Sequence, residues 1–132
     1  MTRPIFEMRF TAAPEHIDEL GHVNNAVWVQ WMEQVATTHW RAVADPGHQD
    51  DYVWVVVRHE MDYLRAVLEG ETITARTWAG EPRGAKFDRH IEFIGEDGRL
   101  RVRSRTDWAI IDKASGPALP IPPQVARPFL DG

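Results

Sequence analysis

The sequence contains no cysteine, and its only lysines are Lys86 and Lys113. Without cysteine there are no disulfides, thiolate metal ligands or cysteine nucleophiles, so any covalent chemistry must come from another side chain. No apolar stretch reaches the roughly 18 to 20 residues that a membrane-crossing helix needs. Residues 1–10 also carry charges where a signal peptide would have its apolar region. We therefore expect a cytoplasmic protein with no membrane partner.

Positive charge is scarce as well. The 15 Lys and Arg residues face 20 Asp and Glu residues, which gives a formal net charge of −5. This is the wrong sign for a protein that neutralises a phosphate backbone, so no nucleic-acid partner is expected. The length of 132 residues and the hydrophobic content of 43% are typical of one folded domain. We expect that domain to span residues 1–132, with a proline-rich tail over residues 117–132.

Hydrophobic periodicity predicts one strand, then one long helix, then four more strands. The helix is expected over residues 25–44, because this stretch contains neither glycine nor proline and Asn24 can cap its start. Alternating or β-branched stretches predict the strands: residues 6–10, 52–64, 71–79, 86–94 and 99–112. A loop is expected at residues 80–84. Short turns between the last four strands force antiparallel neighbours.

The fold class that follows is α+β, with a five-stranded antiparallel sheet wrapped around one long central helix. Such an open sheet has two unpaired edges. One stable solution is for an edge to pair with the same edge of another copy. We therefore expect a homodimer, and a homotetramer stays open.

Polar and titratable residues are concentrated just before the predicted helix. Within residues 16–25 lie Asp18, Gly21, His22, Asn24 and Asn25. The free N–H groups of a helix N-terminus favour an anion, or an oxygen that becomes anionic during a reaction. Gly21 would let the backbone turn sharply or approach a ligand. Asp18 is thus a candidate general base or nucleophile acting on a carbonyl group.

The same residues also have purely structural interpretations. Asp18 and Asn24 are residue types that cap turns, and His22 could be an ordinary hydrogen-bonded histidine. A metal site built from His16, Asp18, His22 and His59 is a further alternative. Its ligand spacing carries little signal, so no metal is expected. The residue types alone do not choose between catalysis and local structure.

The run Asp18-x-x-Gly21-His22-Val23-Asn24-Asn25, followed by the aromatic Trp28, resembles the motif of the 4-hydroxybenzoyl-CoA thioesterase-like family of hotdog-fold acyl-CoA thioesterases. The resemblance continues through residues 61–65, 70–71 and 108–112. It implies a hotdog fold, in which a sheet wraps one long helix. It also implies hydrolysis of an acyl-CoA in a site between two subunits. Coenzyme A would be part of the substrate, and no cofactor is implied.

By this resemblance Asp18 stands at the family's catalytic carboxylate. His22 and Asn24 are grouped with it as catalytic residues that position the loop, the thioester or the water. The backbone N–H groups that polarise the carbonyl oxygen map loosely to residues 50–53. Leu20 stands where the related plant acyl-carrier-protein thioesterases have Asn, and those enzymes also use Cys, which this chain lacks. Only the Asp-based mechanism carries over.

The predicted substrate-binding residues fall into two groups. Gly21, Asn25, Trp28 and Tyr63 are assigned to the thioester and acyl part, although Trp28 stands where many relatives have Tyr and is also a natural core residue. Arg83 and Lys86 are assigned to the coenzyme A phosphates, since their glycine-containing loop can also offer backbone N–H groups.

Four arginines, at positions 99, 101, 103 and 105, share one face of the last strand. They are expected on a solvated outer face with carboxylate partners such as Glu92. Two rival functions stay open. One is a dehydratase or lyase acting on acyl thioesters, for which Glu33 is the only acid in the helix, and the other is acyl-CoA binding without catalysis. The acyl group itself is not determined.

Overall fold

The computed structural model describes residues 3–131 of the chain. A strand and a short 3-10 turn precede the long helix, and the remaining strands follow it. In chain order the elements are β1 (Phe6–Thr11), η1 (Pro14–His16), α1 (Asn25–Val43), α2 (Pro46–Asp51), β2 (Tyr52–Tyr63), β3 (Thr72–Arg83), β4 (Lys86–Gly95), β5 (Leu100–Asp112), β6 (Ala118–Leu119) and α3 (Pro123–Leu130). Within residues 3–131 no helix combines the length and the apolar character that crossing a bilayer requires.

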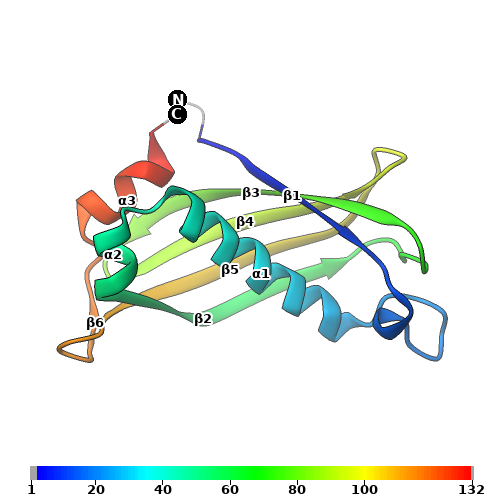
Figure 1. The fold of residues 1–132 in the computed structure, drawn as a ribbon, viewed down its shortest axis with the longest axis horizontal. Coiled ribbons are helices and arrows are strands. Elements are labelled where there is room, and N and C mark those ends of the chain that lie inside the picture. The colour runs from blue at the N-terminus through cyan, green and yellow to red at the C-terminus, as the bar shows by residue number, and fades with distance from the viewer. Residues whose placement is uncertain (1–2, 132) are drawn as a thin grey trace.

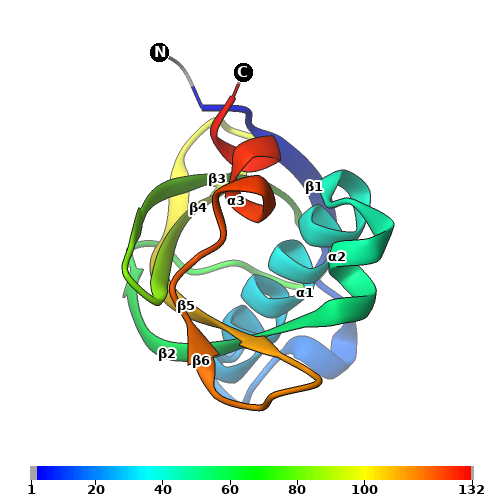
Figure 2. The ribbon, with the colours of Figure 1, turned by 90° about the vertical axis from the view of Figure 1, so that its left-hand side faces the viewer.

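The strands form one antiparallel sheet in the order β1-β3-β4-β5-β2, and β6 adds a two-residue pairing to the end of β5. The sheet curls around α1, which runs along its concave face (Figures 1 and 2). The predicted hotdog architecture, with five long strands around one helix, is therefore confirmed. The short sixth strand, β6, was not predicted.

Helix α1 begins where the sequence predicts. The side-chain oxygen of Asn24 accepts a hydrogen bond from the N–H of Ala26 at 2.8 Å, which satisfies one of the free donors at the helix start. The helix ends at Val43, one residue before the predicted end, and the N–H of Ala44 donates to the Trp40 carbonyl. One face of the helix is buried against the sheet and consists of Val27, Trp28, Trp31, Met32, Val35, Ala36 and His39.

Two hydrophobic clusters fill the space between α1 and the sheet. The N-terminal core surrounds the first half of α1 and contains Phe10, Ala12, Val23, Val27, Trp28, Trp31, Met32, Val35, Val67, Ile73, Ala75, Ile91, Phe93 and Val102. The C-terminal core surrounds the end of α1 and contains Ala44, Ala79, Phe87, Ile110, Ile121, Val125, Ala126 and Phe129. Buried polar residues also face the interior: His39, Thr77, Ser104 and Thr106.

Three segments differ from the sequence prediction. The expected loop at residues 80–84 is mostly strand, because β3 continues to Arg83 and its pairing with β4 resumes at Pro82 after an irregularity. The expected loop after α1 contains the short helix α2. The proline-rich tail contains β6 and α3, and α3 buries Val125, Ala126 and Phe129 in the C-terminal core. Short helices that start with proline show little hydrophobic periodicity in the sequence, and their formation depends on tertiary packing.

The strand alternation predicts one solvated outer face for the arginines of β5, but the structure places them in different environments. Arg101 is only 8% exposed. It donates to the Ala66 carbonyl at 3.0 Å and forms ion pairs with Glu71 at 3.3 Å and Asp97 at 3.2 Å. The pairing of β4 with β5 is irregular next to it, which turns its side chain away from the outer face. Arg103 stays exposed and pairs with Asp62 at 3.1 Å.

Candidate active site

The motif before α1 folds into a tight loop. Ile17 and Val23 form an isolated antiparallel bridge, which brings the two ends of the loop together. Inside it, the N–H of Asp18 donates to the His22 carbonyl at 2.9 Å and the N–H of Gly21 donates to the Asp18 carbonyl at 3.0 Å. Gly21 has a φ of +82°, a conformation that residues with a Cβ rarely adopt. This explains the glycine of the motif.

The Asp18 carboxylate is held by the backbone of its own loop. Its Oδ1 accepts the N–H of Leu20 at 2.9 Å and, at a longer 3.4 Å, the N–H of His22. Within residues 3–131 the other oxygen, Oδ2, has no hydrogen-bond partner, and the residue is half-buried. One oxygen therefore fixes the orientation of the carboxylate, while the other is free to accept a proton or to attack a carbonyl carbon.

The loop is anchored to the rest of the molecule through backbone and ring contacts. The N–H of Val23 donates to the Val67 carbonyl at 2.8 Å, and the N–H of Asn24 donates to the His16 carbonyl at 2.9 Å. The His16 Nδ1 atom accepts the N–H of Ala13 at 2.9 Å, and the His16 ring packs edge-on against Trp31. These contacts fix the loop that carries the Asp18 carboxylate against the N-terminal core.

The other predicted catalytic residues take different positions around this loop. The Asn24 side chain caps α1 by accepting the N–H of Ala26, which is the structural role that the sequence also allows for this residue. His22 and Asn25 are exposed beside Asp18 at the start of the helix. His16, Asp18, His22 and His59 are not gathered into a metal-binding group, and residues 3–131 contain no cluster of three or more such side chains.

Tyr63 and Trp28 lie at the same end of the molecule as the loop. Tyr63 ends β2 and is 44% exposed, its hydroxyl lies 3.8 Å from the sulfur of Met61, and partial burial raises its pKa. Trp28 is 3% exposed and packs edge-on against Trp31 and Phe93. In the single chain Trp28 is therefore a core residue under the loop.

Arg83 and Lys86 lie at the opposite end of the sheet. They face each other across the β3–β4 hairpin. Strand β3 begins at Thr72, which pairs with Thr11 near the loop, and ends at Arg83. At about 3.3 Å per residue, the two ends of this 12-residue strand are about 36 Å apart. Residues 50–53 also lie at that far end, past the C-terminus of α1 (Figure 1). A single chain does not bring these groups to Asp18.

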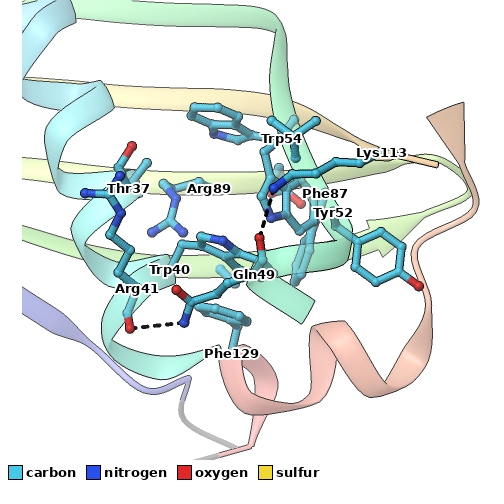
Figure 3. Close-up of a pocket in the computed structure, with 15 residues that line it drawn as sticks. Thr37, Trp40, Arg41, Gln49, Tyr52, Trp54, Phe87, Arg89, Lys113 and Phe129 are labelled. Atoms are coloured by element: carbon cyan, nitrogen blue, oxygen red, sulfur yellow. Dashed lines mark hydrogen bonds between the residues drawn. The ribbon is translucent and has the colours of Figure 1, made fainter. Parts of the chain in front are cut away.

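A cavity of about 290 Å³ opens at this far end of the molecule. Figure 3 shows the side chains around it, which come from α1, α2, β2, β4 and α3 among others. Its lining consists of Ala36, Thr37, Trp40, Arg41, Gln49, Tyr52, Val53, Trp54, Ala79, Phe87, Asp88, Arg89, Trp108, Lys113 and Phe129. The lining is mainly aromatic and apolar, and its charged residues are the cations Arg41, Arg89 and Lys113 and the acid Asp88.

Arg89 is the charged residue at the interior face of the cavity. Its Nη1 donates to the Nδ1 of His39 at 2.8 Å and to the Oγ1 of Thr77 at 2.9 Å. Burial lowers the pKa of Arg89 to about 10, which still leaves it charged at neutral pH. Burial, and then the charge of Arg89, lower the pKa of His39 to about 3, so His39 is neutral.

The sequence analysis missed this pair, although a signal was present. Phe87, Ile91 and Phe93 set the apolar phase of β4, and Arg89 occupies the position between Phe87 and Ile91 in that same phase. A charged residue on the core-facing side of a strand departs from the pattern, and such departures mark candidate functional positions. His39 likewise falls on the buried face of α1.

Comparisons with known proteins agree with this architecture. A family model described as the thioesterase-like superfamily matches residues 12–129. A search of curated proteins finds no match. Similar solved structures include a hypothetical protein from Staphylococcus aureus in complex with CoA, with 15% identity, a TM-score of 0.86, and coverage of 97% of this chain and 83% of that one.

Two further structures are similar over nearly their whole length. A thioesterase from Thermus thermophilus, complexed with coenzyme A and Zn, has 21% identity, a TM-score of 0.81, and coverage of 93% of this chain and 90% of that chain. A 1,4-dihydroxy-2-naphthoyl-CoA thioesterase from Synechocystis has 15% identity, a TM-score of 0.81, and coverage of 97% of both chains. At these identities the likeness establishes a shared fold.

Proposed function

The chain belongs to the thioesterase-like superfamily, and on that premise we propose that it is an acyl-CoA thioesterase that hydrolyses an acyl-CoA to a free acid and coenzyme A. The observation that carries the proposal is the Asp18 carboxylate, which the loop holds in one orientation through Oδ1 while Oδ2 has no partner in the described chain. Two of the solved structures with this fold are complexes with coenzyme A, which supports a CoA-bearing substrate.

The chemistry assigned to Asp18 needs only this carboxylate and a polarised carbonyl group. As a general base, Oδ2 takes a proton from water, and the water oxygen attacks the thioester carbon. As a nucleophile, Oδ2 attacks that carbon itself, and water then hydrolyses the acyl intermediate. In either route the C–S bond breaks and the coenzyme A thiolate leaves. Backbone N–H donors would stabilise the negative oxygen that develops on the carbonyl.

A second copy of the chain would complete the site. Within residues 3–131 strand β2 pairs with β5 on one side only, and four of its valines, Val53, Val55, Val56 and Val57, are 37% to 49% exposed. Such an edge favours pairing with another strand. If two copies pair their β2 edges antiparallel about a two-fold axis, the Asp18 loop of one copy faces the end that carries residues 50–53 of the other. The groups that one chain separates then approach each other.

The test is thiol release from a panel of short, medium, long-chain and aromatic acyl-CoAs, measured with a thiol-reactive dye. The informative variant is Asp18→Asn, because its side-chain oxygen can still accept the N–H of Leu20 and keep the loop intact. Loss of the charge should lower kcat by roughly 10²- to 10⁴-fold with a smaller change in KM.

The matched control is Glu19→Gln, which removes one negative charge from an exposed neighbour in the same loop and should keep the wild-type rate. An Asp18→Asn protein with full activity would contradict the assignment of Asp18. Absence of thiol release from every acyl-CoA by the wild-type protein would contradict the proposed reaction. Sedimentation of the same samples tests the proposed dimer. A protein that is monomeric at the assay concentration and fully active would contradict it.

A further inference from the structure

A buried arginine of β5 lies next to the segment that supports the Asp18 loop. The pairing of β5 with β4 passes from Val102 to Leu100 over two consecutive residues of β4, so Arg101 is left out of the ladder. This bulge turns its side chain away from the outer face, and the residue is buried. A buried guanidinium needs partners for its charge and for its N–H groups. The partners of Arg101 show which part of the chain it holds.

The guanidinium of Arg101 contacts the connection between β2 and β3, residues 64–71. Its Nη1 donates to the Ala66 carbonyl at 3.0 Å and lies 3.3 Å from Oε1 of Glu71. The other oxygen of Glu71, Oε2, accepts the N–H of Leu68 at 2.6 Å within the same connection. The backbone carbonyl of Arg101 accepts the first two N–H groups of the connection, at 2.8 and 3.0 Å. One residue of β5 therefore holds this connection at several points.

The same connection supplies a hydrogen bond that anchors the Asp18 loop. Val67 directly follows Ala66, is buried in the N-terminal core, and accepts the N–H of Val23 on its carbonyl at 2.8 Å. Val23 in turn forms the bridge with Ile17 that closes the base of the loop. A short path thus runs from the guanidinium, through two adjacent peptide groups, to the bridge that carries the loop.

Gly95, the last residue of β4, leaves the space that the guanidinium occupies. A Cβ at this position would lie only 2.6 Å from Nη2 of Arg101, which is closer than two such atoms approach each other. Nη2 also pairs with Asp97 in the β4–β5 turn at 3.2 Å. The guanidinium is therefore confined between the backbone of β4 on one side and the connection on the other, and its orientation is fixed.

We propose that Arg101 is a positioning residue for thioester hydrolysis. Its guanidinium fixes residues 64–71, so that the Val67 carbonyl holds the Asp18 loop in the orientation that the reaction needs. The inference rests on the proposed function, because it assigns the reaction to the Asp18 carboxylate.

Loss of the guanidinium should move the loop and leave most of the core in place. The Ala66 carbonyl would lose its donor, and Glu71 and Asp97 would lose the cation that they share. The connection would then have more freedom, and so would the loop that depends on it. A displacement of about 1 Å at a reacting group costs roughly 100-fold in rate, so a small movement of the Asp18 carboxylate is enough to be measured.

Steady-state thiol release by Arg101→Met measures the effect on the reaction. Methionine keeps an unbranched apolar stem and removes every N–H donor of the side chain. We expect kcat to fall by about tenfold to 100-fold with a smaller change in KM, because the change misaligns the carboxylate. Arg103→Met is the matched control and should keep the wild-type kcat, since Arg103 lies on the same strand, is exposed, and pairs with Asp62 on β2.

Hydrogen exchange measured by NMR tests the anchor without any substrate. The rate for the Val23 amide is compared with the rate for Ile91, a fully buried residue of the central strand β4. In Arg101→Met this ratio should rise at least about tenfold, because the loop opens locally while the sheet stays closed. Val125→Ala controls for stability, since Val125 is buried in the C-terminal core and does not border the cavity. It should leave the ratio and kcat unchanged.

Gly95→Ala keeps the test decisive if circular dichroism shows that Arg101→Met does not fold. The new Cβ leaves the arginine present but displaces its guanidinium, so kcat should fall and the exchange ratio should rise. An exchange ratio or a kcat that stays at the wild-type value in both variants would overturn the inference, as would equal changes in Val125→Ala. A wild-type protein that cleaves no acyl-CoA would instead contradict the proposed function, and the exchange ratio alone would then decide whether Arg101 holds the loop.

Discussion

The two ends of helix α1 pack against the sheet in different ways. At the N-terminal end, aromatic residues interlock under the Asp18 loop, and Met32, Ile73, Ile91 and Phe93 are completely buried. At the C-terminal end, a cavity of about 290 Å³ remains, and a charged arginine faces it. The filled end holds the Asp18 loop in a fixed position at its surface, while the open end leaves a cavity between the helix and the sheet. The two ends of one helix thus differ in how completely their side chains fill the space beside it.

The largest expected effect contrasts one aromatic residue from each end. Phe93→Ala removes a fully buried ring from the N-terminal core and should lower the free energy of unfolding by about 3–5 kcal/mol. Phe129→Ala removes a ring that already borders the cavity, so fewer contacts are lost and the cost should be smaller. Urea denaturation of both variants measures the difference. An equal or larger cost for Phe129→Ala would show that the C-terminal end is as tightly packed as the other.

The next effect concerns pH and His39. Because burial lowers its pKa to about 3, folded His39 stays neutral where an unfolded histidine, with its pKa of 6.5, takes up a proton. The unfolded state then binds more protons, so stability falls as the pH falls from about 6.5 towards 3. Between pH 7 and pH 5 this loss should be about 2 kcal/mol.

The measurement is chemical denaturation at both pH values for the wild type, His39→Gln and His59→Gln. His39→Gln should lose less stability on acidification than the wild type, since its side chain does not titrate. His59→Gln changes an exposed histidine on β2 and should keep the wild-type slope. If all three proteins lost the same free energy, the buried neutral state of His39 would be ruled out as its cause.

Enlarging one alanine in each core sharpens the comparison further. Ala75 is completely buried in the N-terminal core, and Ala75→Leu should cost about 1–3 kcal/mol because there is no room for three more carbon atoms. Ala36 lines the cavity, so Ala36→Leu should leave stability within about 1 kcal/mol of the wild type. Thermal unfolding of Ala75→Leu and Ala36→Leu measures the two losses of stability. A similar loss in both would mean that the cavity is closed to a side chain.

The smallest effect tests the start of α1. Asn24→Ala removes the hydrogen bond to the N–H of Ala26 and should cost about 1 kcal/mol of stability. Asn24→Ser keeps a capping oxygen and should recover most of this loss. Since Asn24 adjoins the Asp18 loop, thiol release by Asn24→Ser separates capping from catalysis. A rate that stays low after stability recovers would indicate that the carboxamide itself contributes to the reaction.

Local patterns predicted much of the architecture. The run from Asn25 has no glycine or proline and is capped by Asn24, so its helical state depends on neighbours a few residues away. Strand alternation likewise predicted β1, β4 and β5 within a residue or two at their ends. The motif from Asp18 to Asn25 indicated both a loop–helix junction and a family. The function of these motif residues stays a prediction.

The sequence by itself determined where the long helix and strands lie, because hydrogen bonding and side-chain period act between near neighbours. Only the tertiary structure decided that Arg83 and Lys86 lie far from Asp18, and that α3 closes the C-terminal core. It alone placed His39 of α1 against Arg89 of β4, 50 residues apart. Such contacts depend on how a curled sheet stacks on its helix, and the space left between them is a property of the assembled whole.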